Sequence, residues 1–132
     1  MTNENVGTES APVLRRGSAP RESYPGGEIH WLASRKASGA GELTVGFTVI
    51  EVGANNPRHR HPNCEEVLYV VAGEIRHHIA GTSDVHMIAG DCITIPRDRV
   101  HQAFNVGAYP AELLVSFSHA ERETVIVPDA EG

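Results

Sequence analysis

Two histidines separated by one residue, followed by a pair of glutamates, are the residues of this chain best suited to bind a metal ion. Because successive side chains of a β-strand point to opposite faces, His59 and His61 would emerge on the same face, about 6.6 Å apart at Cα. A carboxylate further along could share that face only if the chain turned first, and the Pro-Asn pair after His61 favours a turn. Either Glu65 or Glu66 could supply it, because alternation alone does not show how many residues the turn contains.

A histidine in the second half of the chain could complete this site. Residues 90–105 contain a Gly-Asp turn, a short β-branched strand, a turn at Pro96 and then His101 at the start of another strand. The first stretch has the same order of features. Two neighbouring antiparallel hairpins would bring His101 opposite the face that carries His59 and His61, so the spacing permits all three imidazoles to meet.

The elements that would position these residues are short strands. Residues 43–52 alternate, which predicts a strand with Phe47 and Val49 on one face and Thr48 and Ile50 on the other. Further strand candidates lie at residues 29–33, 59–61, 66–72, 74–79, 85–88, 92–95, 101–106, 111–117 and 124–127. Gly, Pro, Asn or Asp interrupt them, and no segment has a helical period of useful length. We therefore expect an all-β fold, a sandwich or barrel of antiparallel strands.

Length and composition limit the function. The chain has 132 residues, enough for one hydrophobic core. With 11 Lys+Arg against 17 Asp+Glu, its net charge of −6 argues against nucleic-acid binding. A run of about 18 apolar residues that could span a membrane is missing from the sequence, and the N-terminus does not resemble a signal peptide. Because the two cysteines have neither the close spacing of a thiolate zinc site nor the density of a secreted disulfide scaffold, we expect a reducing, cytoplasmic setting.

Three segments are expected along the chain. Residues 1–27 are rich in Glu, Ser, Pro, Gly and Arg and poor in apolar residues, which predicts a flexible N-terminal arm. Residues 28–128 would form one β domain, and residues 129–132 a short C-terminal tail.

Together the two stretches resemble the paired motifs of the cupin superfamily. The first motif is matched by Gly53, His59, His61, Glu66 and Gly73. The second is matched by Gly90, Pro96, His101 and Asn105, and the 16 residues between the motifs suit the short linker of small single-domain cupins. One position departs from the pattern: Asp98 stands where the family usually has glycine. Aspartate tolerates left-handed turn geometry better than most residues.

The resemblance implies a jelly-roll β-barrel with a metal site inside. It implies that the metal ligands are His59, His61, Glu66 and His101, and it thereby selects Glu66 over Glu65. Three neutral imidazoles and one carboxylate would leave two positions open on a divalent ion such as Fe, Mn, Ni, Co, Cu or Zn.

An inward Glu66 also sets the faces of the strand that follows it. Alternation sends Leu68 and Val70 into the barrel, and Val67, Tyr69 and Val71 to the outer face. The residues expected to line a substrate pocket are Phe47, Leu68, Val70, Gln102 and Phe104. Because the outer face is apolar and needs a cover, similarity to cupins favours a homodimer.

Five other side chains have weaker claims to a role. His77 and His78 are adjacent on a strand, so one faces inward, where packing is expected rather than a place in the pocket. Arg97 and Arg99 could orient a substrate or could be solvated turn residues. Cys92, on a strand, is expected in the core.

The first functional hypothesis is a small metalloenzyme. An open metal position could bind a small oxygenated organic molecule, act as a Lewis acid and, if redox-active, react with O₂. Resemblance to cupins implies dioxygenation, or isomerase, cyclase or lyase chemistry, with Glu66 as ligand only or also as a base. The alternative hypothesis is a non-catalytic cupin that binds a sugar or another metabolite.

Overall fold

The computed structural model describes residues 13–128, and most of the ordered elements in this range are strands. The strands are β1 (Arg21–Tyr24), β2 (Gly27–Ala33), β3 (Thr44–Ile50), β4 (His59–Arg60), β5 (Glu66–Ala72), β6 (Glu74–Ile79), β7 (Val85–Ile88), β8 (Cys92–Ile95), β9 (His101–Asn105), β10 (Ala111–Phe117) and β11 (Val125–Ile126). Two short helical turns, η1 (Arg16–Ser18) and α1 (Arg35–Ser38), precede β1 and follow β2. The predicted all-β fold is confirmed. Neither helical turn in the described range approaches the length of a membrane span.

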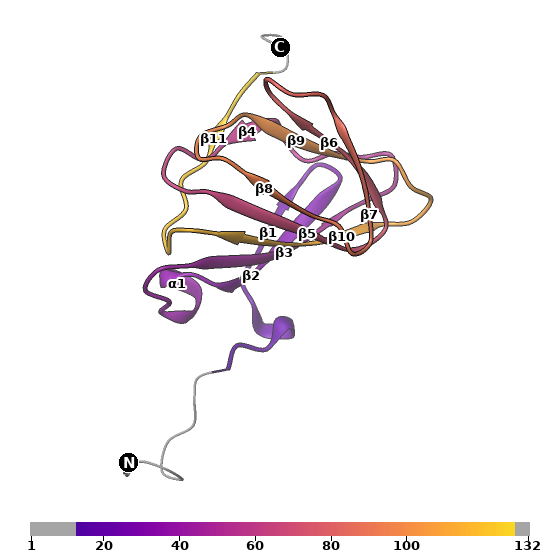
Figure 1. Cartoon of the computed structure of the whole chain (residues 1–132). Coiled ribbons are helices and arrows are strands. Elements are labelled where there is room, and N and C mark those ends of the chain that lie inside the picture. The colour runs from indigo at the N-terminus through magenta and orange to yellow at the C-terminus, as the bar shows by residue number, and fades with distance from the viewer. Residues whose placement is uncertain (1–12, 129–132) are drawn as a thin grey trace, which may run out of the picture.

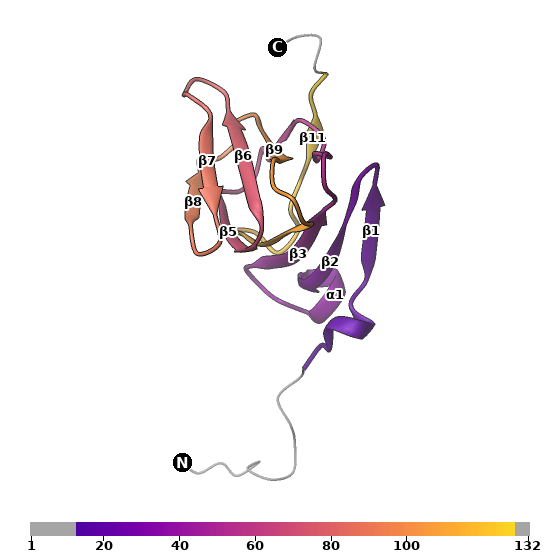
Figure 2. The ribbon, with the colours of Figure 1, turned by 90° about the vertical axis from the view of Figure 1, so that its right-hand side faces the viewer.

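Two antiparallel sheets face each other in a jelly roll (Figure 1). The larger sheet has the order β1-β2-β3-β10-β5-β8, and the smaller has the order β11-β4-β9-β6-β7. Figure 2 shows β1 and β2 at one side of the molecule, β6 and β7 at the other, and β9 between them. Within residues 13–128 the sheets stay separate hydrogen-bonded ladders, so the expected barrel is a jelly-roll sandwich rather than a closed cylinder.

The domain begins earlier than the sequence predicted. β1 pairs with β2 along its whole length and forms one edge of the larger sheet. Just before β1, Ala19 is buried, and the carbonyl of Pro20 accepts a hydrogen bond from the Trp31 backbone N–H at 2.8 Å. Residues 16–27, expected in a flexible arm, therefore belong to the fold, because backbone hydrogen bonds to a sheet edge hold a segment whose side chains are mostly polar. Residues 1–12 of the predicted arm and the tail, residues 129–132, lie outside the described residues.

Phe47, which the sequence predicted to line the pocket, does not lie on the face of β3 that turns toward the core. Thr48 and Ile50 point inward and are buried. Phe47 is also buried, but on the outer face, where the Arg16 guanidinium lies 4.0 Å from the centroid of its ring. Val49 is half-buried on the same outer face. Periodicity alone did not reveal this, because both alternating sets on β3 contain apolar residues and η1, which covers Phe47, lies in the segment expected to be a flexible arm.

β5 follows the predicted alternation. The inner residues Leu68 and Val70 are buried in a core shared by both sheets. On the outer face, Val67, Tyr69 and Val71 remain 37%, 40% and 41% exposed. One face of this strand therefore belongs to the core, and the other presents an apolar surface to solvent.

The expected place of Cys92 was wrong. It begins β8, the second edge of the larger sheet, and it is exposed opposite Tyr69 on the outer face. Cys64, in contrast, is buried, and burial raises the pKa of its thiol to about 11. Because a thiol with so high a pKa carries little thiolate, Cys64 acts as a small apolar side chain.

Candidate metal centre

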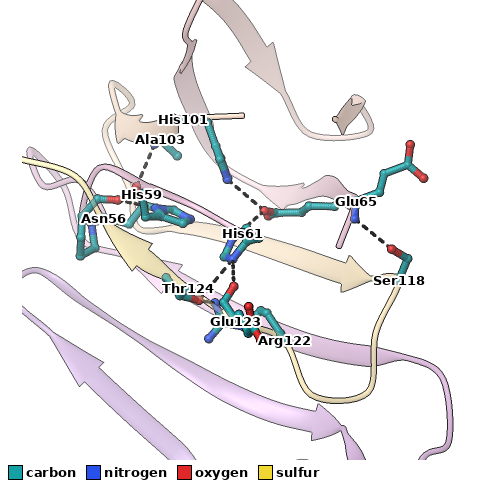
Figure 3. Close-up of polar contacts among 12 residues, drawn as sticks. Asn56, His59, His61, Glu65, His101, Ala103, Ser118, Arg122, Glu123 and Thr124 are labelled. Atoms are coloured by element: carbon teal, nitrogen blue, oxygen red, sulfur yellow. Dashed lines mark hydrogen bonds and ion pairs between the residues drawn. The ribbon is translucent and has the colours of Figure 1, made fainter. Parts of the chain in front are cut away.

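Three separate segments bring the four predicted ligands together. β4 pairs with β9 so that His59 lies opposite His101, while His61 follows β4 and Glu66 opens β5. All four side chains are buried, and one ligand atom from each lies within 4.8 Å of the ligand atoms of the other three. Figure 3 shows the imidazoles of His59, His61 and His101 converging. The convergence inferred from spacing is therefore present in the fold.

The structure also decides between the two glutamates. Glu66 is buried, with its Oε1 3.3 Å from the Nε2 of His61 and 3.2 Å from the Nε2 of His101. Glu65 is exposed, and Figure 3 shows its carboxylate pointing away from the imidazoles. Its backbone N–H donates instead to the hydroxyl of Ser118 at 2.9 Å. The turn after His61 therefore spans residues 62–65. Alternation alone had not shown how many residues this turn contains.

Backbone carbonyls hold two of the histidines in the tautomer that a metal needs. The Nδ1 of His59 lies 2.5 Å from the carbonyl oxygen of Pro57, and the Nδ1 of His61 lies 3.0 Å from that of Glu123. A carbonyl can only accept, so each Nδ1 carries the proton and each Nε2 keeps its lone pair. Such outer partners orient metal-binding histidines in many proteins.

The third histidine is held by another histidine. His77 is the inward member of the His77–His78 pair, as alternation requires, and it is buried behind the site rather than in the cavity. Its Nε2 lies 3.2 Å from the Nδ1 of His101. If the Nε2 of His101 faces a metal, its Nδ1–H donates to the Nε2 of His77, and the remaining proton of His77 is on Nδ1. His78 faces outward, with its Nδ1 2.8 Å from a carboxylate oxygen of Asp84.

The donor atoms that face the centre fit a divalent cation. The Nε2 of His61, the Nε2 of His101 and the Oε1 of Glu66 are buried without a hydrogen-bond partner. In the tautomers just described all three are electron-pair donors, and a cation between them would satisfy all three at once. Three imidazoles and one carboxylate form a donor set for first-row divalent metals. These residues therefore form a site for one divalent metal ion.

The protonation states suit metal binding at neutral pH. Burial, and next the neighbouring His101, lower the pKa of His59 to about 3, so its imidazole is neutral. Burial by itself raises the pKa of Glu66, but the adjacent imidazoles of His101 and His61 outweigh it and hold that pKa below its usual range. Glu66 is therefore a carboxylate already committed to this cluster, which favours the ligand role over that of a base.

A cavity of about 120 Å³ opens beside the cluster. Its polar lining includes His59, His61 and Glu66, and its apolar lining includes the predicted residue Leu68. The whole lining is Glu22, Tyr24, Ile29, Thr48, Asn56, Pro57, His59, His61, Glu66, Leu68, Leu113, Val115, Phe117, Arg122, Thr124 and Ile126.

Four of the five residues predicted to line the pocket lie elsewhere. Phe47 is on the outer face of the larger sheet, and Val70 is buried in the core away from the cavity. Gln102 and Phe104 face away from the site, because alternation on β9 turns them to the opposite side from His101. Gln102 donates to the Asn56 carbonyl at 2.9 Å, and Phe104 packs under the guanidinium of Arg76, 4.1 Å from its ring centroid.

The predicted arginines Arg97 and Arg99 do not line the cavity either, but the turn between them behaves as expected. Asp98 has φ 64, the left-handed geometry for which the family pattern has glycine. Its backbone N–H donates to the carbonyl of His61 at 2.9 Å, and its carboxylate pairs with Arg60 at 2.7 Å. Asp98 therefore attaches the second motif to the first.

Sequence reasoning missed the residues of the cavity that come from outside the two motifs. Tyr24 comes from β1, in the segment expected to be an arm, and Arg122 and Thr124 come from the chain after β10. Thr48 lines the cavity from β3, on the face opposite the predicted residue Phe47. An isolated arginine or tyrosine beyond a motif carries no pattern in the sequence, so the signal for these residues appears only in the fold.

Comparison with known proteins agrees with this architecture. The family model described as "Cupin domain" matches residues 46–117, which is more than half of the chain. The chain belongs to the cupin family.

Proteins similar in sequence to this chain include germin-like proteins and oxalate oxidases. Putative germin-like protein 3-4 of Oryza sativa subsp. japonica is 36% identical over 99 residues, which cover 67% of this chain and 43% of that protein. Oxalate oxidase GF-2.8 of Triticum aestivum is 34% identical over 99 residues, 67% of this chain and 44% of that protein. The chain thus spans less than half the length of these curated relatives.

Solved structures show the same fold. An oxalate oxidase in complex with the substrate analogue glycolate superposes with a TM-score of 0.71 at 27% identity, covering 78% of this chain and 56% of that one. The formate complex of Lactobacillus farciminis oxalate decarboxylase gives a TM-score of 0.82 at 19% identity, covering 92% of this chain and 38% of that one.

Proposed function

We propose that this cupin is a metal-dependent enzyme that acts on a small carboxylic acid, with the oxidation of oxalate as the first candidate reaction. The observation that carries the proposal is the buried His₃Glu cluster beside a cavity of about 120 Å³. A cavity of this volume suits a small substrate of two or three carbons. The similarity to an oxalate oxidase that binds glycolate supports the same size class.

In this proposal, one group of residues would bind the metal ion and another would exclude water from the substrate. His59, His61, Glu66 and His101 would hold the ion, which when bound supplies a Lewis acid and, for a redox-active metal, a path for electrons to O₂. Leu68 and the other apolar lining residues would exclude water from the bound acid. Oxidation of oxalic acid breaks its carbon–carbon bond, releases two CO₂ and passes two electrons and two protons to O₂, which gives H₂O₂.

The other reaction classes expected from the sequence remain alternatives within this proposal. Dioxygenation and Lewis-acid isomerase, cyclase or lyase chemistry also begin with a substrate bound at an open metal position. The cavity volume disfavours large aromatic substrates for any of them, because a ring system with several substituents exceeds it.

Metal analysis followed by turnover assays tests the proposal. Protein purified without a histidine tag should contain about one divalent metal per chain by mass spectrometry. With oxalate it should consume O₂ and release H₂O₂ and CO₂, whereas formate without O₂ uptake would indicate decarboxylation instead. Stoichiometric metal without turnover of oxalate, glycolate or other two- and three-carbon acids would contradict the enzymatic proposal.

One observation favours the non-catalytic alternative. Among the described residues that line the cavity, the titratable groups other than the metal ligands are Glu22, Tyr24 and Arg122, so a dedicated acid–base pair is lacking. A binding cupin needs none. Metal-free protein that bound oxalate as tightly as the metal-loaded protein, by calorimetry, would support this alternative.

We also propose that the chain forms a homodimer through the outer face of β5. The support is the apolar row Val67, Tyr69 and Val71, each more than a third exposed. Light scattering should give twice the chain mass, and Tyr69→Lys should shift it toward the monomer. A monomeric wild-type protein at micromolar concentration would contradict the homodimer.

The cytoplasmic location stays a prediction.

A further inference from the structure

The chain that follows β10 is attached directly to a metal ligand. The carbonyl of Glu123 accepts from the Nδ1 of His61 at 3.0 Å, and the Thr124 hydroxyl lies 3.2 Å from the same nitrogen. Asn63, in the turn after His61, donates to the carbonyl of Glu121 at 2.9 Å and accepts from the N–H of Glu123 at 3.0 Å. This segment is therefore fixed at the cluster by both side chain and backbone.

The segment places one arginine at the cavity. Arg122 lines the same cavity as His59, His61 and Glu66, and Figure 3 shows it beside Thr124 and near His61. Among residues 13–128, Arg122 is the one lysine or arginine in this lining.

The contacts of this guanidinium are neutral. It lies 4.5 Å from the centroid of a Trp31 ring and 5.1 Å from that of Phe117, and it donates to the Thr124 hydroxyl. Glu22, on the cavity rim, accepts instead from the Trp31 indole N–H at 3.2 Å. The aromatic faces and the fixed backbone orient Arg122, while its remaining N–H donors have no carboxylate partner among the described ion pairs.

Charge and size together define what would occupy the space between Arg122 and the cluster. A divalent ion with one carboxylate and three neutral imidazoles keeps a net positive charge, and the guanidinium adds a second positive group. A substrate with an anionic group at each end would neutralise both. At about 120 Å³, the cavity suits such a molecule of two or three carbons.

A wider groove leads to the same arginine. A depression of about 550 Å³ between β1, β2, α1 and the chain after β10 shares Glu22 and Arg122 with the metal cavity. Its lining also contains Arg21 and Lys36. Arg122 therefore stands where the outer groove meets the inner cavity, on the path by which an anion would enter.

We propose that Arg122 forms an anion-binding subsite of the metal cavity, which binds the second carboxylate of a two- or three-carbon dicarboxylate whose first carboxylate binds the metal. The proposal rests on the proposed function, because it assumes a small acid bound at the metal. It adds the substrate class, a dicarboxylate in preference to a monocarboxylate, and the residue that selects it. Arginine suits this role because its planar fork can bind a carboxylate with two parallel hydrogen bonds.

Ligand binding to metal-loaded variants tests the subsite. Calorimetry would compare oxalate with glycolate, a monoanion of similar size, on the wild type, Arg122→Met and Arg122→Lys. The loss of a charge-assisted bidentate pair should raise the Kd for oxalate about tenfold or more in Arg122→Met, while the Kd for glycolate changes less than about threefold. Arg122→Lys should retain part of the preference, because it keeps the charge without the fork.

A matched control removes a similar arginine from the other face of the larger sheet. Arg16 also stacks on a phenylalanine, Phe47, but it does not line the cavity. Arg16→Met should keep the wild-type Kd for both acids. Metal content and thermal unfolding of each variant show whether Arg122→Met still folds and holds its ion; if it does not, Arg122→Lys and the wild type carry the comparison.

The outcomes separate the subsite from the proposed function. Equal weakening of oxalate and glycolate binding, or an unchanged Kd for oxalate in the Arg122 variants, would overturn the subsite and leave the proposed function standing. A metal-loaded wild type that binds no oxalate would overturn both.

Discussion

The two faces of β5 show how one alternating strand serves two different surfaces. On the inner face, Glu66 meets two imidazoles across the sandwich, and Val70 is fully buried. On the outer face, Tyr69 and Val71 remain 40% and 41% exposed. Both faces are rich in apolar residues, so composition does not distinguish them. What distinguishes them is the surface opposite: the smaller sheet covers the inner face, and solvent reaches the outer one.

The largest expected effect falls on the inner face. His101→Ala should abolish stoichiometric metal binding, because loss of a direct ligand exceeds the roughly 10–100-fold cost of losing an outer-shell partner. The core should stay folded, since His101 contributes little apolar area. Metal analysis and circular dichroism check both halves of the prediction. Full metal content in this variant would show that His101 is not a ligand.

A matched pair of valines compares the packing of the two faces. Val70→Ala should lower the free energy of unfolding by about 2–3 kcal/mol, from two lost methyl groups and the cavity they leave. Val71→Ala should change it by about 0.5 kcal/mol or less, as for most surface positions. Urea denaturation at low protein concentration measures both. Equal costs at the two positions would mean that the outer face is as well covered as the core.

A smaller expected effect concerns the neighbouring strand β6, where the inward His77 should make the free energy of unfolding depend on pH. Burial, and next His101, lower the pKa of His77 to about 4 from the ordinary 6.5. Between these values the unfolded chain binds the proton and the folded chain does not, so stability falls as the pH decreases, by about 1.4 kcal/mol per pH unit for this group. From pH 6.5 to about pH 5 the loss is about 2 kcal/mol.

Two histidine variants check this assignment. In chelated protein, His77→Leu should show a weaker dependence of unfolding free energy on pH than the wild type. His78→Gln, which changes the outward neighbour, should keep the wild-type dependence. If His77→Leu titrates like the wild type, the acid sensitivity arises from other groups.

The part of the fold that the sequence could predict is local. Strand positions, turn positions and the inner face of β5 follow from alternation and from Gly and Pro, which act over a few residues. The outward direction of Gln102 and Phe104 was available from the same alternation once His101 was taken as inward. The outward direction of Phe47 could not be predicted in this way, since the chain that covers it comes from before β1.

The sequence by itself determined the ligand types, their order and the spacing of the two motifs, and these were enough to indicate a cupin metal site. The family resemblance also selected Glu66 over Glu65, and the contacts of Glu66 confirm it. Only the tertiary structure decided that His77 supports His101 and that Arg122 lines the cavity. The physical reason is the sequence separation over which each effect acts. Side-chain direction along a strand depends on neighbours in the chain, whereas burial, tautomer and charge at the site depend on groups far away in sequence.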